Sequence, residues 1–249
     1  MRFKEKVAII TGGARGIGRT IAEGLVSEGA SVVIGDVNVE DVSRTAHEIE
    51  KAFGGPTVPF KLDVKKKRDI LSLVDGTMKE FGRVDILCNN AGICNSPPID
   101  EITEEEWDEM MDVNLKGVFL CCQAVMPIMK KQKRGRILSM ASMAGRVGGL
   151  AAGAHYSASK AGVICLTKSF ARALATYSVT VNALAPGPVD TDMLQTLPSD
   201  RREFMRTECP LERFADTTDI AAAALFLLSD AARHITGTTL DVNGGLFMS

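Results

Sequence analysis

A tyrosine and a lysine, Tyr156 and Lys160, lie four residues apart in a segment whose apolar residues recur at helical spacing. Residues at this spacing project from the same face of a helix. A phenol has a pKa of about 10 and is a weak base at neutral pH, but a neighbouring positive charge favours its ionised form. The pair is therefore suited to exchange a proton with a substrate hydroxyl group. An exposed helical pair without chemistry has the same spacing, so the rest of the chain must decide.

The glycine-rich turn Thr11–Gly18 directly follows the apolar run Val7–Thr11 and precedes a helical pattern of apolar residues. Glycines in such a turn let the backbone approach a pyrophosphate, whose charge then faces the free N–H groups of the next helix. Strand, turn and helix in this order predict a dinucleotide-binding site. Its candidate cofactor-binding residues are Gly12, Arg15, Gly16, Ile17 and Gly18.

Asp36 closes the second apolar run, about where a carboxylate is expected to accept hydrogen bonds from the adenosine ribose hydroxyls. A 2′-phosphate would meet a like charge there, so Asp36 predicts NAD as the cofactor in preference to NADP. Arg15 is the counter-evidence, because a guanidinium in the turn can pair with a 2′-phosphate. We expect the carboxylate to dominate. Asp36 can at the same time cap the turn into a helix that begins near Val39.

Short β-branched runs alternate with longer segments of helical period, the pattern of a parallel sheet with helices on both faces. The runs are continuously apolar, as in strands that are buried on both faces. No linker or repeat divides the 249 residues, so we expect one doubly wound (Rossmann) α/β domain, residues 1–249, with a seven-stranded parallel sheet. The predicted strands are Val7–Thr11, Ser31–Asp36, Thr57–Leu62, Val84–Cys88, Arg136–Met140, Val179–Leu184 and Thr238–Val242.

The composition excludes several classes of protein. With 45% apolar and 24% charged residues the chain is globular, and a formal net charge of -2 lacks the basic excess that nucleic-acid binding usually requires. No apolar run reaches the roughly 18 residues of a membrane helix, so neither an anchor nor an export signal is expected. The six cysteines show no C-x-x-C spacing and no clustered histidine, which argues against a metal site or disulfides and favours a reducing, cytoplasmic setting.

Further motifs complete a known pattern. They are Asn89-Asn90-Ala91-Gly92, Asn114, Ser142 and Pro186-Gly187, together with the glycine-rich turn and the Tyr156/Lys160 pair. In this combination the chain resembles the short-chain dehydrogenase/reductase family, in its single-domain branch of this length, over the whole sequence. The resemblance implies hydride transfer between a nicotinamide cofactor and a CH–OH group or its ketone.

The resemblance also implies the catalytic roles. Tyr156 is expected to act as the acid/base and, with Lys160, to contact the cofactor as well. Ser142 matches the serine that hydrogen-bonds the substrate oxygen; Ser139 is a rival in the same segment, but Ser142 lies just past the strand. Asn114 interrupts an apolar helix, where asparagine is unfavourable. The matching residue in the family holds a water bonded to the lysine, and the structural alternative is a core polar residue that distorts the helix.

Cofactor contacts implied by the resemblance extend beyond the turn. Asp63 and Val64, at the end of the third strand, look like the pair that contacts the adenine. Asn90 resembles the residue that packs against the cofactor after the fourth strand. Val189 and Thr191 are similar to the residues that meet the nicotinamide carboxamide.

The leading hypothesis is an NAD-dependent oxidoreductase that interconverts a secondary alcohol (a polyol, sugar, hydroxyacyl compound or similar) and its ketone, with Ser142 and Tyr156 at the substrate. The alternative is an NADPH-dependent 3-oxoacyl-carrier-protein reductase, which the region Val242–Gly245 resembles and against which Asp36 argues. A catalytically silent NAD-binding sensor would not need the complete catalytic set. Residues 192–214 are expected to cover a small-molecule substrate without naming it. The resemblance further suggests a homotetramer.

Overall fold

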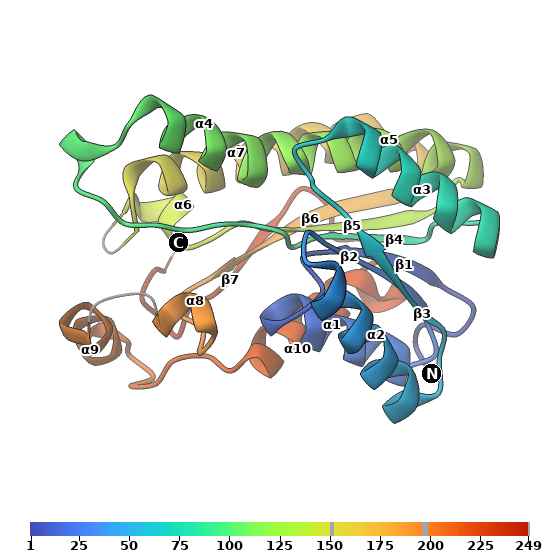
Figure 1. The fold of residues 1–249 in the computed structure, drawn as a ribbon, viewed down its shortest axis with the longest axis horizontal. Coiled ribbons are helices and arrows are strands. Elements are labelled where there is room, and N and C mark those ends of the chain that lie inside the picture. Colours follow the sequence, from blue (N-terminus) through green and yellow to red (C-terminus); the bar gives the residue numbers. More distant parts are fainter. Residues whose placement is uncertain (150–151, 196–198, 249) are drawn as a thin grey trace.

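The computed structural model of the protein describes residues 1–149, 152–195 and 199–248. Seven strands, all parallel, form one sheet in the order β3-β2-β1-β4-β5-β6-β7, with helices on both of its faces (Figure 1). The predicted doubly wound α/β fold is confirmed. The strands are β1 (Val7–Thr11), β2 (Ser31–Asp36), β3 (Thr57–Lys61), β4 (Ile86–Asn89), β5 (Gly135–Met140), β6 (Val179–Pro186) and β7 (Thr239–Val242).

The bounds of β1 and β2 match the predicted ones, and those of the other five strands differ by one or two residues. β4 begins at Ile86, where the prediction begins at Val84, and β6 continues to Pro186, where the prediction ends at Leu184. Strand ends keep only part of the hydrogen-bonding ladder, so hydrophobicity alone places them poorly. Pro59 lies inside β3, which is tolerated because β3 is an edge strand.

Two layers of helices enclose the sheet. The helices are α1 (Gly16–Ser27), α2 (Val39–Phe53), α3 (Lys67–Phe81), α4 (Glu104–Met111), α5 (Gly117–Gln132), α6 (Ala144–Val147), α7 (Ala154–Leu174), α8 (Asp192–Gln195), α9 (Ser199–Glu208) and α10 (Thr217–Leu228). Helices α1, α2 and α10 cover the face drawn below the sheet in Figure 1, and α3, α5 and α7 cover the face drawn above it. A π-helical turn, Asp112–Lys116, joins α4 to α5.

The sheet separates two apolar cores. Ile21 and Leu25 lie fully buried in the core beneath it, and Val125 and Val163 lie in the core above it. Neighbouring strand residues point to opposite faces, so consecutive residues of a central strand enter different cores. This is why the central strands are continuously apolar.

Local sequence signals explain where helices begin and end. The Asn38 side chain accepts hydrogen bonds from the N–H groups of Glu40 and Asp41 and so caps α2, which ends at Gly54 in the left-handed conformation. Thr103 and Glu106 form a reciprocal capping box at the start of α4.

Within the described residues, one helical stretch, Glu104–Gln132, is long and apolar enough to cross a membrane by length and composition alone. A core helix of a globular protein meets the same criterion. Cys121, Val125 and Met129 of this stretch are buried in the core above the sheet. One face of the stretch therefore packs on the upper side of the sheet, and 33% of its apolar window is buried.

Candidate active site

The glycine-rich turn lies where the strand order reverses, between the ends of β1 and β4, the position at which doubly wound sheets bind ligands. Asn90 Nδ2 donates hydrogen bonds to the carbonyl oxygens of Thr11 (3.2 Å) and Gly12 (2.8 Å), which fixes the turn to β4. Gly12 has a φ of +65°, and a Cβ on Gly18 would lie 2.3 Å from the Gly12 carbonyl oxygen. Both positions therefore require glycine.

The start of α1 is suited to a pyrophosphate. Arg15 is its N-cap residue, and no side chain of the described residues hydrogen-bonds there as a cap. The first N–H groups of the helix, at Gly16, Ile17 and Gly18, therefore remain available to an anion, as at other dinucleotide sites. The residues present fit the predicted dinucleotide.

Asp36 ends β2 beside this turn. One carboxylate oxygen accepts a hydrogen bond from Ala14 N (3.3 Å) and the other from Asn38 N (3.3 Å). The helix that follows begins at Val39, as the sequence predicts, but its cap is Asn38. Asp36 caps the turn into this helix by accepting from Asn38 N, as the sequence predicts, whereas Asn38 supplies the capping oxygen of α2 itself.

The other predicted cofactor residues also follow the carboxyl ends of strands, after β3 and after β6. Asp63 accepts from Lys65 N (3.1 Å) and forms an ion pair with Lys66 (3.1 Å), and Val64 beside it is buried. Val189 is buried as well. The Thr191 side chain approaches the glycine-rich turn, because a Cβ added to Gly16 would lie 3.7 Å from its methyl group.

Lys160 is buried on α7, with 5% of its surface exposed. Its Nζ lies 5.7 Å from the centroid of the Tyr156 ring and donates a hydrogen bond to the Met140 carbonyl at the end of β5 (2.7 Å). Burial lowers the pKa of the Lys160 ammonium to about 8. The predicted Tyr156/Lys160 pair is thus brought together at the end of β5.

The pKa of the Tyr156 hydroxyl is set mainly by burial. Burial raises the pKa of Tyr156, the Cys94 thiol raises it further, and a hydrogen bond with the Ser142 side chain lowers it. The sequence predicts that a neighbouring positive charge lowers the pKa of Tyr156, but Lys160 does not provide this lowering in the protein alone. A bound positive ring would have to contribute.

The two candidate serines have different surroundings. Ser139 is 2% exposed inside β5, and its hydroxyl accepts a hydrogen bond from Asn89 Nδ2 (3.1 Å). Ser142 lies beyond the strand end, accepts from Ala144 N (3.1 Å) and is near enough to Tyr156 to lower the pKa of its hydroxyl. Of the two, Ser142 alone is placed beside the tyrosine.

Asn114 is fully buried in the π-helical turn between α4 and α5. Its Oδ1 accepts from Ile93 N (2.9 Å), and its Nδ2 donates to Ile93 O (2.9 Å) and to Ser159 Oγ (3.2 Å). The structural alternative for this residue holds, because the helix is distorted there. The same distortion aims the amide at the backbone after β4. The water-holding role that the resemblance implies stays a prediction.

Sequence reasoning missed Ser159 and Cys94. Ser159 is fully buried and donates a hydrogen bond to the Tyr156 carbonyl oxygen (2.7 Å) while accepting from Asn114. Cys94 lies near Tyr156 and Lys160, and burial raises the pKa of its thiol to about 11. A serine directly before the lysine was a visible signal, whereas nothing local marks Cys94. His155 is buried beside Tyr156, and its ring nitrogens have no hydrogen-bond partner among the described residues.

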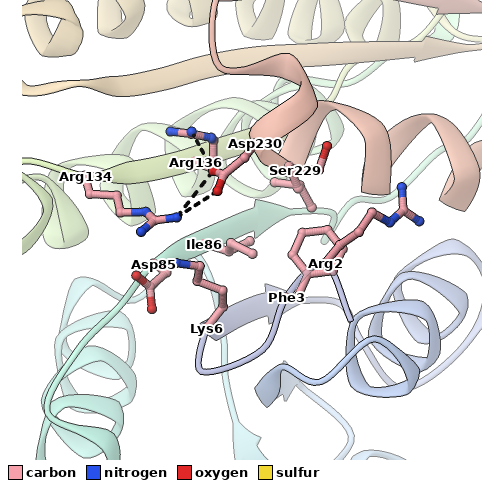
Figure 2. A pocket seen from close by; sticks show the side chains of 10 residues that line it. Arg2, Phe3, Lys6, Asp85, Ile86, Arg134, Arg136, Ser229 and Asp230 are labelled. Carbon is pink, nitrogen blue, oxygen red and sulfur yellow. Dashed lines mark hydrogen bonds and ion pairs between the residues drawn. The ribbon is translucent and has the colours of Figure 1, made fainter.

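A small pocket lies at the opposite end of the sheet, where strands β4 and β5 begin (Figure 2). Arg134 and Arg136 both pair there with Asp230, each at 3.1 Å. Its cavity of about 10 Å³ has room for one water molecule. This pocket is too small for a dinucleotide or a substrate, so it does not compete with the edge where Tyr156 lies.

A family model described as enoyl-(acyl carrier protein) reductase matches residues 12–247. The chain belongs to the short-chain dehydrogenase/reductase family. As a member, it is an oxidoreductase that uses a nicotinamide cofactor and acts on a CH–OH group or its ketone. Within the described residues, no three His, Cys, Asp or Glu side chains group as metal ligands.

Similar proteins of this family cover the whole chain. The 3-oxoacyl-[acyl-carrier-protein] reductase of Staphylococcus epidermidis is 42% identical over 98% of this chain and 99% of its own, and that of Thermotoga maritima is 39% identical over 99% of each. A crystal structure of a 3-oxoacyl-[acyl-carrier protein] reductase from Brucella melitensis superimposes with a TM-score of 0.94 at 36% identity, covering 100% of this chain and 93% of that one. Another, from the same organism and with bound NAD, gives 0.92 at 35% identity with the same coverage.

Proposed function

We propose that this protein is an NADH-dependent reductase of 3-oxoacyl thioesters, which also runs in reverse on the 3-hydroxyacyl products. The observation that carries the proposal is the assembly of Ser142, Tyr156 and Lys160 at the end of β5, in a chain similar over its whole length to reductases named for this substrate. This narrows the leading hypothesis of a general secondary-alcohol dehydrogenase. The substrate class is that of the alternative hypothesis, a 3-oxoacyl-carrier-protein reductase, and the choice of NADH rests on Asp36.

The catalytic residues divide the work as follows. The nicotinamide supplies the hydride when it is bound. Tyr156 donates its hydroxyl proton to the ketone oxygen as the carbon is reduced, and Ser142 hydrogen-bonds the same oxygen while its negative charge develops. Lys160 stabilises the tyrosinate that results, and Asn114 holds the backbone of Ile93 in place beside this pair.

The preference for NADH over NADPH rests on Asp36. Its carboxylate is oriented by the N–H groups of Ala14 and Asn38, beside the turn that would hold the pyrophosphate. A 2′-phosphate at this place would meet its charge. A structure of a similar chain, the Brucella melitensis reductase, contains bound NAD.

Residues 192–214 remain the proposed cover of the substrate, within one domain of residues 1–249. The described part of this segment contains α8 and α9, and α9 has no buried residue. A helix that does not pack into the core can move to admit a bulky acyl chain. Residues 196–198 lie outside the described part.

We also propose that the chain forms a homotetramer, partly through the outer face of α4, α5 and α7. A groove of about 590 Å³ lies on this face, lined by residues that include Leu115, Phe119 and Leu166. Trp107 and Phe119 are 42% and 39% exposed. Exposed apolar patches of this kind mark protein contacts. Multi-angle light scattering tests the proposal, and a monomer at micromolar concentration would refute it.

The experiment that tests the function is a substrate panel read by nicotinamide absorbance. Acetoacetyl groups on acyl carrier protein and on coenzyme A are offered with NADH and NADPH, beside sugars, polyol-derived ketones and ketosteroids. We expect the thioesters with NADH to give the highest kcat/KM. A higher kcat/KM for a ketone without a thioester would overturn the proposed substrate class.

A further inference from the structure

Helix α6 carries the turn that holds Ser142, yet it has only four residues, too few to be stable without tertiary contacts. Ser142 is tied to this helix twice, because its hydroxyl accepts from Ala144 N (3.1 Å) and its carbonyl accepts from Gly145 N (3.0 Å). A Cβ on Gly145 would lie 2.7 Å from Ala161 N and from the Lys160 carbonyl carbon. The helix therefore rests directly on the backbone of α7, and a shift of α6 would move Ser142.

Arg146, on the same helix, reaches across to the edge strand β7. Its Nη2 donates to the Thr239 carbonyl oxygen (2.8 Å), and its Nε and Nη2 donate to the two carboxylate oxygens of Asp241 (3.3 and 3.2 Å). The two charged side chains are only 22% and 18% exposed. The guanidinium also lies 5.8 Å from the ring centroid of Phe247, near the C-terminus.

These contacts fix α6 relative to β7 through a bidentate arginine–carboxylate pair. A planar guanidinium that binds both oxygens of one carboxylate fixes orientation as well as distance. Thr239 O lies on the free edge of β7, because Thr238 O and Val242 O accept from the β6 side. Arg146 therefore donates a hydrogen bond to a backbone carbonyl that no neighbouring strand pairs with. Figure 1 shows α6 at the end of the sheet away from the N-terminus.

We propose that Arg146 is a positioning residue, which clamps α6 to Asp241 and the edge of β7 and so holds Ser142 in place beside Tyr156. The proposal rests on the proposed function, since it concerns the reaction at Ser142. A purely structural ion pair would stabilise β7 without affecting the serine. The two can be separated by kinetics.

The test compares Arg146→Met, Arg146→Lys and Asp241→Asn with the wild type. Arg146→Met keeps the aliphatic stem, so it removes the clamp with little change in packing. We expect kcat to fall about tenfold while the Kd for NADH stays unchanged, because small displacements of a catalytic group cost that much or more. Arg146→Lys should recover only part of the loss, since an ammonium cannot form the paired bonds.

Two further variants complete the design. Arg146→Met combined with Asp241→Asn should be no slower than Arg146→Met alone, because both changes break one interaction. Arg134→Met is the matched control: it removes an arginine–aspartate pair at the opposite edge of the sheet, with Asp230. The control should keep kcat within about twofold of the wild type.

A pH profile provides a readout that a structural role would not move. The hydrogen bond from Ser142 lowers the pKa of Tyr156. Its loss raises that pKa, so the acidic limb of the profile for alcohol oxidation should move to higher pH in Arg146→Met and stay in place in Arg134→Met. An unchanged limb, or an unchanged kcat, in Arg146→Met overturns the positioning role.

Hydrogen exchange distinguishes failure of the clamp from failure of the proposed function. Amides in residues 142–149 should exchange faster in Arg146→Met than in the wild type, with no change in Arg134→Met. Unchanged exchange overturns the clamp. Faster exchange in a protein whose wild type reduces no 3-oxoacyl thioester supports the clamp and overturns the proposed substrate.

Discussion

The guanidinium of Arg15 lies 3.3 Å from the carboxylate of Asp192, so the glycine-rich turn is joined to the first residue of α8. The two residues are 177 positions apart in the chain. Arg15 was the sequence feature that favoured NADP. In the folded protein its charge is directed to a carboxylate of the segment proposed to cover the substrate.

This pair predicts a modest effect on cofactor choice. Both side chains are about 80% exposed, at 78% and 81%, so the pair contributes little to stability. Asp192→Asn should release Arg15 to bind a 2′-phosphate and lower the KM for NADPH a few-fold, with the KM for NADH unchanged. Steady-state kinetics with both cofactors check this, with Asp200→Asn on α9 as the control. An equal fall in both KM values would contradict it.

Asp36 should dominate cofactor choice. Asp36→Ala removes the acceptor for the ribose hydroxyls and the charge that repels a 2′-phosphate. We expect the ratio of kcat/KM for NADH to that for NADPH to fall at least tenfold, which corresponds to about 1.4 kcal/mol. Asp63→Ala, a carboxylate further along the same edge, should change the two cofactors alike. A ratio that stays constant in Asp36→Ala would refute the ribose argument.

Tyr156→Phe removes the proton donor and leaves the ring. Turnover should fall by about a thousandfold or more, while NADH still binds with a Kd within a few-fold of the wild type. Fluorescence titration measures the binding and nicotinamide absorbance the turnover. The other tyrosine, Tyr177, lies after α7, and its ring centroid is 5.0 Å from Lys130 Nζ, so Tyr177→Phe is a matched control that should remain active. Near-normal activity of Tyr156→Phe would exclude the acid/base role.

Burial of Lys160 predicts a pH dependence of stability. Its folded pKa of about 8 lies below the ordinary value of 10.5, so between these values the unfolded chain binds the extra proton and the stability contribution of this residue rises with pH. Below pH 8 the buried charge is a constant penalty. Lys160→Met should therefore increase the free energy of unfolding more at pH 7 than at pH 10.5, by up to about 3 kcal/mol.

Urea unfolding of the wild type and Lys160→Met at both pH values provides the measurement. The difference between the two proteins isolates the lysine, because other groups titrate alike in both. A difference that is the same at pH 7 and pH 10.5 would show that Lys160 titrates normally in the folded chain.

Much of the fold could be predicted because its signals are local. The apolar runs mark all seven strands to within two residues. The turn after β1 requires glycine, since a Cβ on Gly18 would touch Gly12, and these glycines can be recognised in the sequence. The spacing of Tyr156 and Lys160 is equally local. The bounds of β4 and β6 were less accessible, since the hydrogen bonds that end a strand depend on its neighbours.

Other features depend on contacts between distant segments. Nothing near Cys94 marks it as a neighbour of Tyr156, and nothing near Arg146 indicates a partner 95 residues away. The pKa values of Tyr156 and Lys160 also moved in directions set by burial, which the helical spacing does not encode.

The sequence by itself determined the sheet, the glycine-rich turn and the candidates for the reacting side chains, because periodicity, glycine geometry and residue type are properties of short segments. Only the tertiary structure decided which groups surround the Tyr156 hydroxyl, where Arg15 directs its charge and what holds α6 in place. Those outcomes depend on desolvation and on hydrogen bonds across the end of the sheet, and both arise only when the chain has folded.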